Sequence, residues 1–162
     1  MYSTDKDYIS TKIYYNMIIT VQKMKEVFAY CNKTYFEGKL ARPKLSTSRS
    51  ANYIARVYCI PNYETRRCGG IEIKFSELFD FNEEQLISIM CHEMIHLSLY
   101  RRFIIEKEEH GPRWHKMADE IKEKHGLDIE AIESPKQVVK QTLGGKIKDF
   151  IFDTFFYRPL TK

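Results

Sequence analysis

The amino-acid sequence predicts a single α+β domain in which an N-terminal helix, a small three-stranded antiparallel sheet and two further helices share one core. Apolar residues recur every three or four positions in the stretch 13–37, a period typical of helices, and the stretch 83–102 is apolar on nearly all sides, as in a buried helix. Between residues 45 and 75 they alternate with polar residues, as in strands. A chain of 162 residues has the length of one ordinary domain.

In the first half of the chain, the spacing of apolar residues changes once, from a helical to a strand-like period. The helix predicted for residues 13–37 ends at Gly38. Three short strands follow, and we expect them to pair antiparallel; they cover about 45–49, 53–59 and 71–75. The polar stretch 61–70 ends in the pair Gly69-Gly70, which favours a hairpin loop before the last strand.

Two helices are predicted in the second half. Asn82 is a good N-cap residue, and Gln85 three positions later completes a capping-box pattern. The helix that follows, over about 83–102, is apolar on nearly all sides, so we expect it to be buried and rigid. Pro112 is favoured at the first position of another helix, and Gly126 marks the end of that helix.

The predicted domain comprises residues 1–133, and the C-terminal tail 134–162 is expected to pack on it. Within the tail, residues 150–157 fit a helix or a strand equally well. The first residues of the sequence include acidic ones and lack the uninterrupted apolar stretch that a signal peptide needs, and no run of about 18 apolar residues occurs in the sequence. We therefore expect a cytoplasmic protein, or a nuclear one if the source is eukaryotic, without a membrane partner.

The cysteines do not form a metal-binding pattern. The four of them are scattered, with no C-x-x-C pair: Cys31, Cys59, Cys68 and Cys91. A zinc ribbon and a dense disulfide framework are both disfavoured by this spacing, so we expect reduced structural thiols.

The strongest functional signal is the stretch His92-Glu93-Met94-Ile95-His96. Residues four apart lie on the same face of a helix, so His92 and His96 could bind one metal ion. Glu93 would lie beside them, able to reach a water molecule on the metal, as a metal-dependent hydrolase requires. Two histidines with only a core or surface role are disfavoured, because this motif seldom arises by chance in a chain of this length.

A catalytic zinc usually has three protein ligands and leaves a fourth position open. The spacing leaves several candidates for the third ligand: His110, His115, Asp119 and Glu120. His110 is slightly favoured, since it lies where a loop enters a new helix and could return beneath the first two histidines. Asp119 or Glu120 would give a carboxylate version of the same site.

Several sequence blocks together resemble the SprT-like, Spartan-related zinc metallopeptidases. Besides the His-Glu-x-x-His motif they are Phe36-Glu37-Gly38-Lys39-Leu40 with Pro43 and Leu45, Gly70 with Ile71 and Ile73, and His110-Gly111-Pro112 with Trp114. The resemblance covers about residues 24–125. It implies a zincin-like fold of the minimal gluzincin type.

The resemblance also implies a site and a reaction. His92, His96 and His110 would bind Zn2+, and Glu93 would be the general base in the hydrolysis of peptide bonds. Trp114 falls where the family has an aromatic residue, although a core role in its helix is the favoured interpretation. Many members carry a C-terminal zinc ribbon, but the tail of this chain has no cysteine, so we expect the catalytic domain without that ribbon.

The partners implied by the resemblance are proteins associated with or crosslinked to DNA, and single-stranded or junction DNA itself. Cations of the strand region and the tail could contact phosphates: Arg49, Arg56, Arg66, Arg67, Lys136, Lys140, Lys146, Lys148 and Arg158. A merely solvated surface explains these charges equally well. Two rival functions are a zinc peptidase unrelated to DNA and a zinc-stabilised nucleic-acid-binding module without catalysis. Glu93 argues against the module, because a structural zinc site needs no base.

Overall fold

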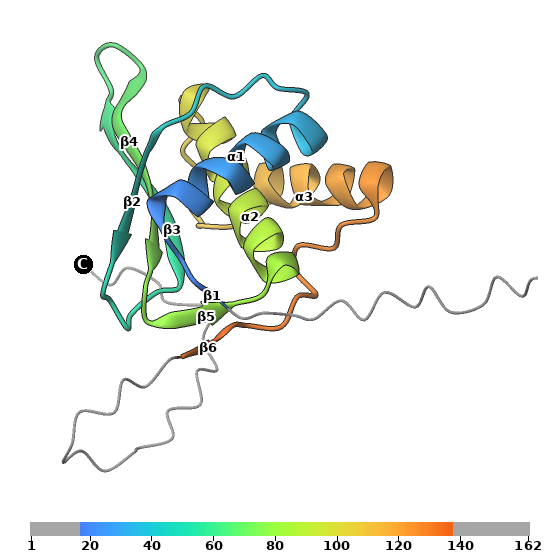
Figure 1. Cartoon of the computed structure of the whole chain (residues 1–162). Helices are drawn as coiled ribbons and strands as arrows, with labels where there is room; N and C mark the ends of the chain where they lie inside the picture. The colour runs from blue at the N-terminus through green and yellow to red at the C-terminus, as the bar shows by residue number, and fades with distance from the viewer. Residues whose placement is uncertain (1–16, 138–162) are drawn as a thin grey trace, which may run out of the picture.

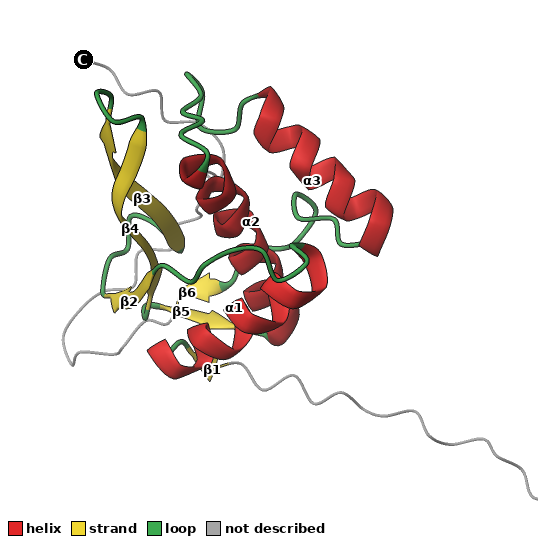
Figure 2. Ribbon diagram, turned by 90° about the horizontal axis from the view of Figure 1, so that it is seen from above, coloured by secondary structure: helices red, strands yellow, loops and turns green. Residues whose placement is uncertain are grey.

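In the computed structural model, which describes residues 17–137, three helices lie on one side of a three-stranded sheet (Figures 1 and 2). A second, smaller sheet lies at one end of the helices (Figure 1). Its antiparallel strands are β1 (Met17–Ile18), β5 (Phe79–Phe81) and β6 (Lys136–Gln137). The predicted α+β class is confirmed.

The first helix, α1 (Val21–Tyr35), starts later than predicted. Thr20 is its N-cap, with extended backbone and a side-chain oxygen that accepts the N–H of Lys23 (3.1 Å). Because the chain forms strand β1 before Thr20, the helix cannot continue upstream through it. Residues 13–16, also assigned to this helix by the sequence, lie outside the described residues. The helix also ends two residues earlier than predicted, at Tyr35, and the left-handed residues Glu37 (φ +55°) and Gly38 (φ +70°) follow it.

The main sheet is mixed, so the prediction of a fully antiparallel sheet is wrong. Its strands are β2 (Lys44–Ser48), β3 (Ala55–Asn62) and β4 (Arg67–Ser76), in the order β2-β4-β3. β3 is antiparallel to β4, whereas β2 is parallel to it. The connection from β2 to β3 bends around the end of β4, where Ser76 donates hydrogen bonds to the carbonyls of Ile54 (2.7 Å) and Ser50 (2.5 Å). β4 therefore lies between the two strands that precede it.

The hairpin between β3 and β4 is longer than predicted. Only residues 63–66 connect the strands, whereas residues 61–70 were expected to form the loop. Asn62 closes the turn by accepting the N–H of Thr65 (2.9 Å). Gly70, at φ +58°, lies where the register shifts, so this glycine forms a β-bulge within the ladder instead of a turn.

Both later helices agree with the sequence. In α2 (Glu83–Arg101) the capping box is complete: the Asn82 side chain accepts the Gln85 N–H (2.8 Å), and the Gln85 side chain accepts the Asn82 N–H (3.0 Å). α3 (Pro112–His125) has proline at its first position and ends at Gly126, which is left-handed with φ +72°.

α2 is the central element of the domain. It contacts β3 and β4 on one side and α1 and α3 on the others. Most of its apolar side chains are buried: Leu86, Ile89, Met90, Met94, Ile95, Leu97 and Leu99. This packing holds the helix firmly, so side chains on it have fixed positions.

Two features complete the fold. Among the described residues, no helix is long and apolar enough to cross a lipid bilayer. Of the tail, the structure describes residues 134–137, which include strand β6 paired with β5. Residues 138–162, and with them the segment 150–157, lie outside the described part.

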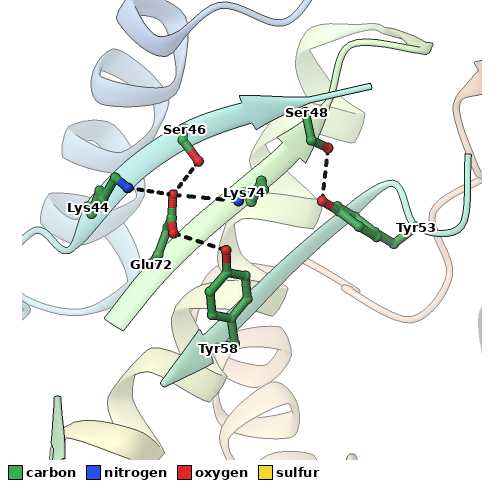
Figure 3. Close-up of polar contacts among 7 residues, drawn as sticks. All are labelled: Lys44, Ser46, Ser48, Tyr53, Tyr58, Glu72 and Lys74. Atoms are coloured by element: carbon green, nitrogen blue, oxygen red, sulfur yellow. Dashed lines mark hydrogen bonds and ion pairs between the residues drawn. The ribbon is translucent and has the colours of Figure 1, made fainter. Parts of the chain in front are cut away.

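The outer face of the main sheet carries a polar cluster centred on Glu72, which is only 8% exposed (Figure 3). Its carboxylate accepts hydrogen bonds from the hydroxyls of Ser46 in β2 and Tyr58 in β3 (3.0 Å for Tyr58). The ammonium groups of Lys44 and Lys74 lie 3.3 and 3.8 Å from it. The Ser46 hydrogen bond is the largest of the interactions that lower the pKa of Glu72. One carboxylate thus joins all three strands.

Candidate metal centre

Three histidines from two parts of the chain converge beside α2. His92 and His96 lie one turn apart on that helix, and His110 ends the loop that precedes α3. The Nε2 atoms of His92 and His110 are 2.9 Å apart, and one nitrogen from each of the three rings lies within 4.8 Å of the others. The loop therefore returns His110 to the face of α2 that carries the motif.

The protein environment keeps these imidazoles neutral. Burial lowers the pKa of His92 well below its ordinary value, and the neighbouring His96 and His110 lower it further. Burial and His110 lower the pKa of His96 to about 3, and burial also lowers the pKa of His110. A neutral imidazole has a free lone pair, the form in which histidine binds a metal.

The three nitrogens fit a zinc ion. Zinc binds histidine nitrogen at about 2.0–2.1 Å in tetrahedral geometry, which places two such ligands about 3.4 Å apart. The separations here, from 2.9 Å to at most 4.8 Å, bracket that value. Three imidazoles are also a donor set that zinc favours, and three protein ligands leave a fourth position for water or substrate.

Glu93 is buried next to the histidine cluster, with 5% of its surface exposed. Burial raises the pKa of its carboxyl group to about 8, although the backbone amide of Val57 in β3 favours the ionised form. The carboxyl group therefore lies between α2 and the strand beside it. A pKa near neutrality suits a group that both accepts and returns a proton.

Glu106, which the sequence analysis did not single out, holds the start of the helix that follows His110. Its carboxylate accepts the backbone N–H groups of Arg113 (3.0 Å) and Trp114 (3.2 Å) in the first turn of α3. It thus caps the helix whose N-terminus follows His110 directly, and its negative charge is favourable there. The capping residue lies several positions upstream of the helix, outside the local pattern that identifies most N-caps.

Gly111 makes this arrangement possible. A Cβ atom at this position would lie 2.6 Å from the Cδ of Glu106, closer than real side chains approach each other. A larger residue at this position would displace the Glu106 carboxylate from the backbone N–H groups that it caps, whereas the backbone of Gly111, with φ −79°, is open to any residue. The His110-Gly111-Pro112 sequence now has a physical reason at each position.

Trp114 is a core residue, as predicted, and it also contacts the histidine cluster. Its side chain is fully buried, as a core residue should be. Its indole ring also packs against the cluster, with ring centroids 4.4 Å from His110 and 4.7 Å from His92. The ring therefore supports two of the imidazoles from one side.

The other candidates for a third ligand lie elsewhere. His115 is on α3 and its Nδ1 lies 3.1 Å from Glu130. Asp119 and Glu120 are exposed on the same helix. Among the described residues, the one group of potential ligands within metal-binding reach is that of the three histidines.

The four cysteines all fall in the described part of the chain. Each is a free thiol, and two of them, Cys31 and Cys91, are buried. Burial, together with the Cys68 thiol beside it, raises the pKa of Cys59 to about 12. None of these sulfur atoms joins the histidine cluster.

Comparison with known families gives one match. The model of the SprT-like family matches residues 24–135, a range that begins in α1 and ends immediately before β6. It contains both helix-borne histidines, the loop with His110, and the whole main sheet. A comparison with curated individual proteins finds no significant match.

Proposed function

Since the chain belongs to the SprT-like family, we propose that it is a zinc-dependent metallopeptidase with a zincin-like fold. The observation that carries this proposal is the cluster of three neutral histidines, His92, His96 and His110, with the buried carboxyl group of Glu93 beside it. A purely structural zinc site would usually have a fourth protein ligand and would need no neighbouring carboxylate.

Each residue then has a distinct part in the reaction. Bound zinc would supply Lewis acidity, which lowers the pKa of a water molecule and polarises the scissile carbonyl. The three histidines would hold the ion through neutral imidazoles. Glu93 would accept the proton of the attacking water and pass it to the leaving amine, since its carboxyl group is buried beside the histidines.

The position of β3 supports a peptide substrate. β3 is an edge strand of the main sheet and lies against α2. An extended peptide can add to such an edge through main-chain hydrogen bonds, which bind the substrate without regard to its side chains. Because Val57 of β3 is next to Glu93, a peptide on this edge would pass the histidine cluster.

We further propose that the substrates are proteins associated with or crosslinked to DNA. On the sheet, the guanidinium of Arg56 lies over the rings of Tyr53 and Tyr58, at 4.7 and 4.9 Å. Cations next to aromatic rings are a common surface for single-stranded nucleic acid. The competing proposal, a peptidase that acts on other proteins, assigns these side chains to the solvated surface.

The test is proteolysis of a DNA-binding protein by the purified chain, with and without single-stranded DNA. Glu93→Gln removes the base but leaves all three histidines free, so activity should fall at least about a hundredfold while zinc content stays the same. Glu123→Gln changes an exposed glutamate on α3 and should keep full activity.

Other outcomes separate the alternatives. Equal cleavage by the parent and Glu93→Gln would refute the hydrolytic mechanism. Cleavage unaffected by DNA would favour a peptidase with other substrates. Absence of cleavage in both proteins, with zinc fully bound, would favour a zinc-stabilised binding module.

A further inference from the structure

The four free cysteines form two neighbouring pairs, of which one is accessible to solvent. Cys31 of α1 and Cys91 of α2 lie side by side in the core and are fully buried. Cys59 of β3 and Cys68 of β4 are both partly exposed. A reagent in solution can therefore reach the second pair in the folded protein, whereas it reaches the first pair only when the core opens.

The strand register places the thiols of Cys59 and Cys68 on the same face of the main sheet. Cys68 is opposite Pro61, and Cys59 lies two positions before Pro61, so both side chains point to the face that packs on the core. Diagonal positions of this kind are about 7–8 Å apart in a regular ladder. The β-bulge at Gly70 increases the local twist, and here the two thiols are close enough to form a hydrogen bond.

The end of the hairpin has room to bring the two side chains closer. A disulfide needs its two Cβ atoms about 3.8 Å apart, which is less than the spacing of diagonal positions in a regular ladder. All residues between the two cysteines, 60–67, are exposed. The strands can therefore shift here without displacing side chains of the core.

The pair faces α2 on the side of the metal centre. Tyr100 lies one turn after His96 on α2, and the centroids of their rings are 6.3 Å apart. Burial, followed by the charges of Cys59 and Glu93, raises the pKa of Tyr100 to about 12, so Tyr100 lies within electrostatic reach of both groups. A bond between Cys59 and Cys68 would fix the hairpin close to this centre, where β3 forms an edge of the main sheet.

We propose that Cys59 and Cys68 are a redox-sensitive modification site, which a low-molecular-weight disulfide such as glutathione disulfide oxidises to a reversible intramolecular disulfide. The proposal does not depend on the proposed peptidase function. It adds a covalent change in the hairpin whose edge strand, β3, lies against α2.

The exchange takes place in two steps. Burial and the neighbouring Cys68 thiol raise the pKa of Cys59 to about 12, so Cys59 keeps its proton and Cys68 is the first nucleophile. The Cys68 thiolate attacks one sulfur of glutathione disulfide, forms a mixed disulfide and releases one glutathione thiolate, which takes up a proton. Cys59 then loses its proton to solvent, attacks the Cys68 sulfur and releases the second glutathione. The two protein thiols lose two electrons and two protons in total, and one glutathione disulfide becomes two glutathione thiols.

The test is peptide mapping of the whole folded chain after incubation with glutathione disulfide. Trypsin cleaves after Arg56, Arg66, Arg67 and Lys74, so the two cysteines fall in separate peptides, 57–66 and 68–74. Free thiols are blocked before digestion, and mass spectrometry without reductant should find these two peptides joined. Dithiothreitol should separate them. Cys31 and Cys91 serve as the internal control and should form a bond at least about tenfold more slowly, since they react only when the core opens.

Cys59→Ser tests the second step. Without Cys59 to resolve it, the mixed disulfide should accumulate as a glutathione adduct on Cys68, whereas the parent should release it. Equal adduct on the parent and on Cys59→Ser would overturn the proposal. So would a parent in which peptides 57–66 and 68–74 stay separate, join only in urea, or join no faster than Cys31 and Cys91 react.

Discussion

Glu106 and Gly111 shape the junction between His110 and α3, although neither is a candidate ligand. The carboxylate of Glu106 fixes the first turn of α3, and Gly111 leaves room for that carboxylate. Residues that orient metal ligands commonly affect metal affinity about 10–100-fold when they are replaced. The geometry of the site therefore depends on this loop as well as on α2.

We expect Glu106→Ala to weaken zinc binding about tenfold, because His110 loses its fixed position. The same change removes a helix cap and should reduce the free energy of unfolding by about 1 kcal/mol. Competition with a chelator measures the affinity, and urea unfolding measures the stability. Glu108→Ala, which changes an exposed glutamate in the same loop, is the control. Equal zinc affinity of the two variants would show that Glu106 has no positioning role.

At the scale of secondary-structure elements, local signals predicted the helices but not the strand order. The capping box at Asn82, the proline at Pro112 and the glycine at Gly126 mark α2 and α3 because the signals that end a helix lie within a few residues of its ends. Alternation of apolar and polar residues shows that a segment forms a strand, but it does not show which other strand pairs with that segment. For that reason the parallel pairing of β2 with β4 could not be predicted.

In the candidate site, too, local signals were predictable from the sequence and contacts that depend on the tertiary fold were not. Helical spacing alone placed His92 and His96 together, since it needs no knowledge of the tertiary fold. His110 was only slightly favoured by spacing and became the expected ligand through the family resemblance. Glu106 was missed, because its contacts depend on how the loop folds back on α3.

The Glu72 cluster should make the sheet sensitive to acid. The pKa of the Glu72 carboxyl group is lowered in the folded protein, chiefly by the Ser46 hydrogen bond and further by Tyr58. The folded protein therefore binds the proton of Glu72 less readily than the unfolded chain does. Its stabilisation is present above the ordinary pKa of about 4.5 and disappears as the pH falls through the lower folded value. Stability thus decreases on the acidic side of that window.

Glu72→Gln should therefore be less stable than the parent at pH 7 by about 1 kcal/mol, and the difference should shrink below about pH 4.5. Urea unfolding of both proteins at several pH values measures it. Glu64→Gln, in the exposed turn of the hairpin, should follow the parent throughout. A difference from the parent that is independent of pH would mean that the ionised carboxylate is not the stabilising form.

At the scale of the whole molecule, the histidine cluster brings together two separate parts of the chain. His92 and His96 belong to α2, whereas His110 belongs to the loop before α3. A ligand that binds the folded state alone stabilises it by about 2.7 kcal/mol when its concentration is one hundred times its dissociation constant. Zinc should thus contribute to folding as well as to catalysis.

Removing zinc with a chelator should lower the melting temperature by roughly 5–10 °C, since 1 kcal/mol corresponds to about 2–4 °C in a domain of this size. His92→Ala should melt at the lower temperature with or without added zinc, because it lacks one ligand. His115→Ala is the matched control: this histidine lies outside the cluster, so the variant should keep the full response to zinc. Calorimetry of the three proteins gives the answer. If the parent melts at the same temperature with zinc and with chelator, the histidine cluster does not hold the metal in the folded protein; if His115→Ala alone loses the response, the third ligand is His115.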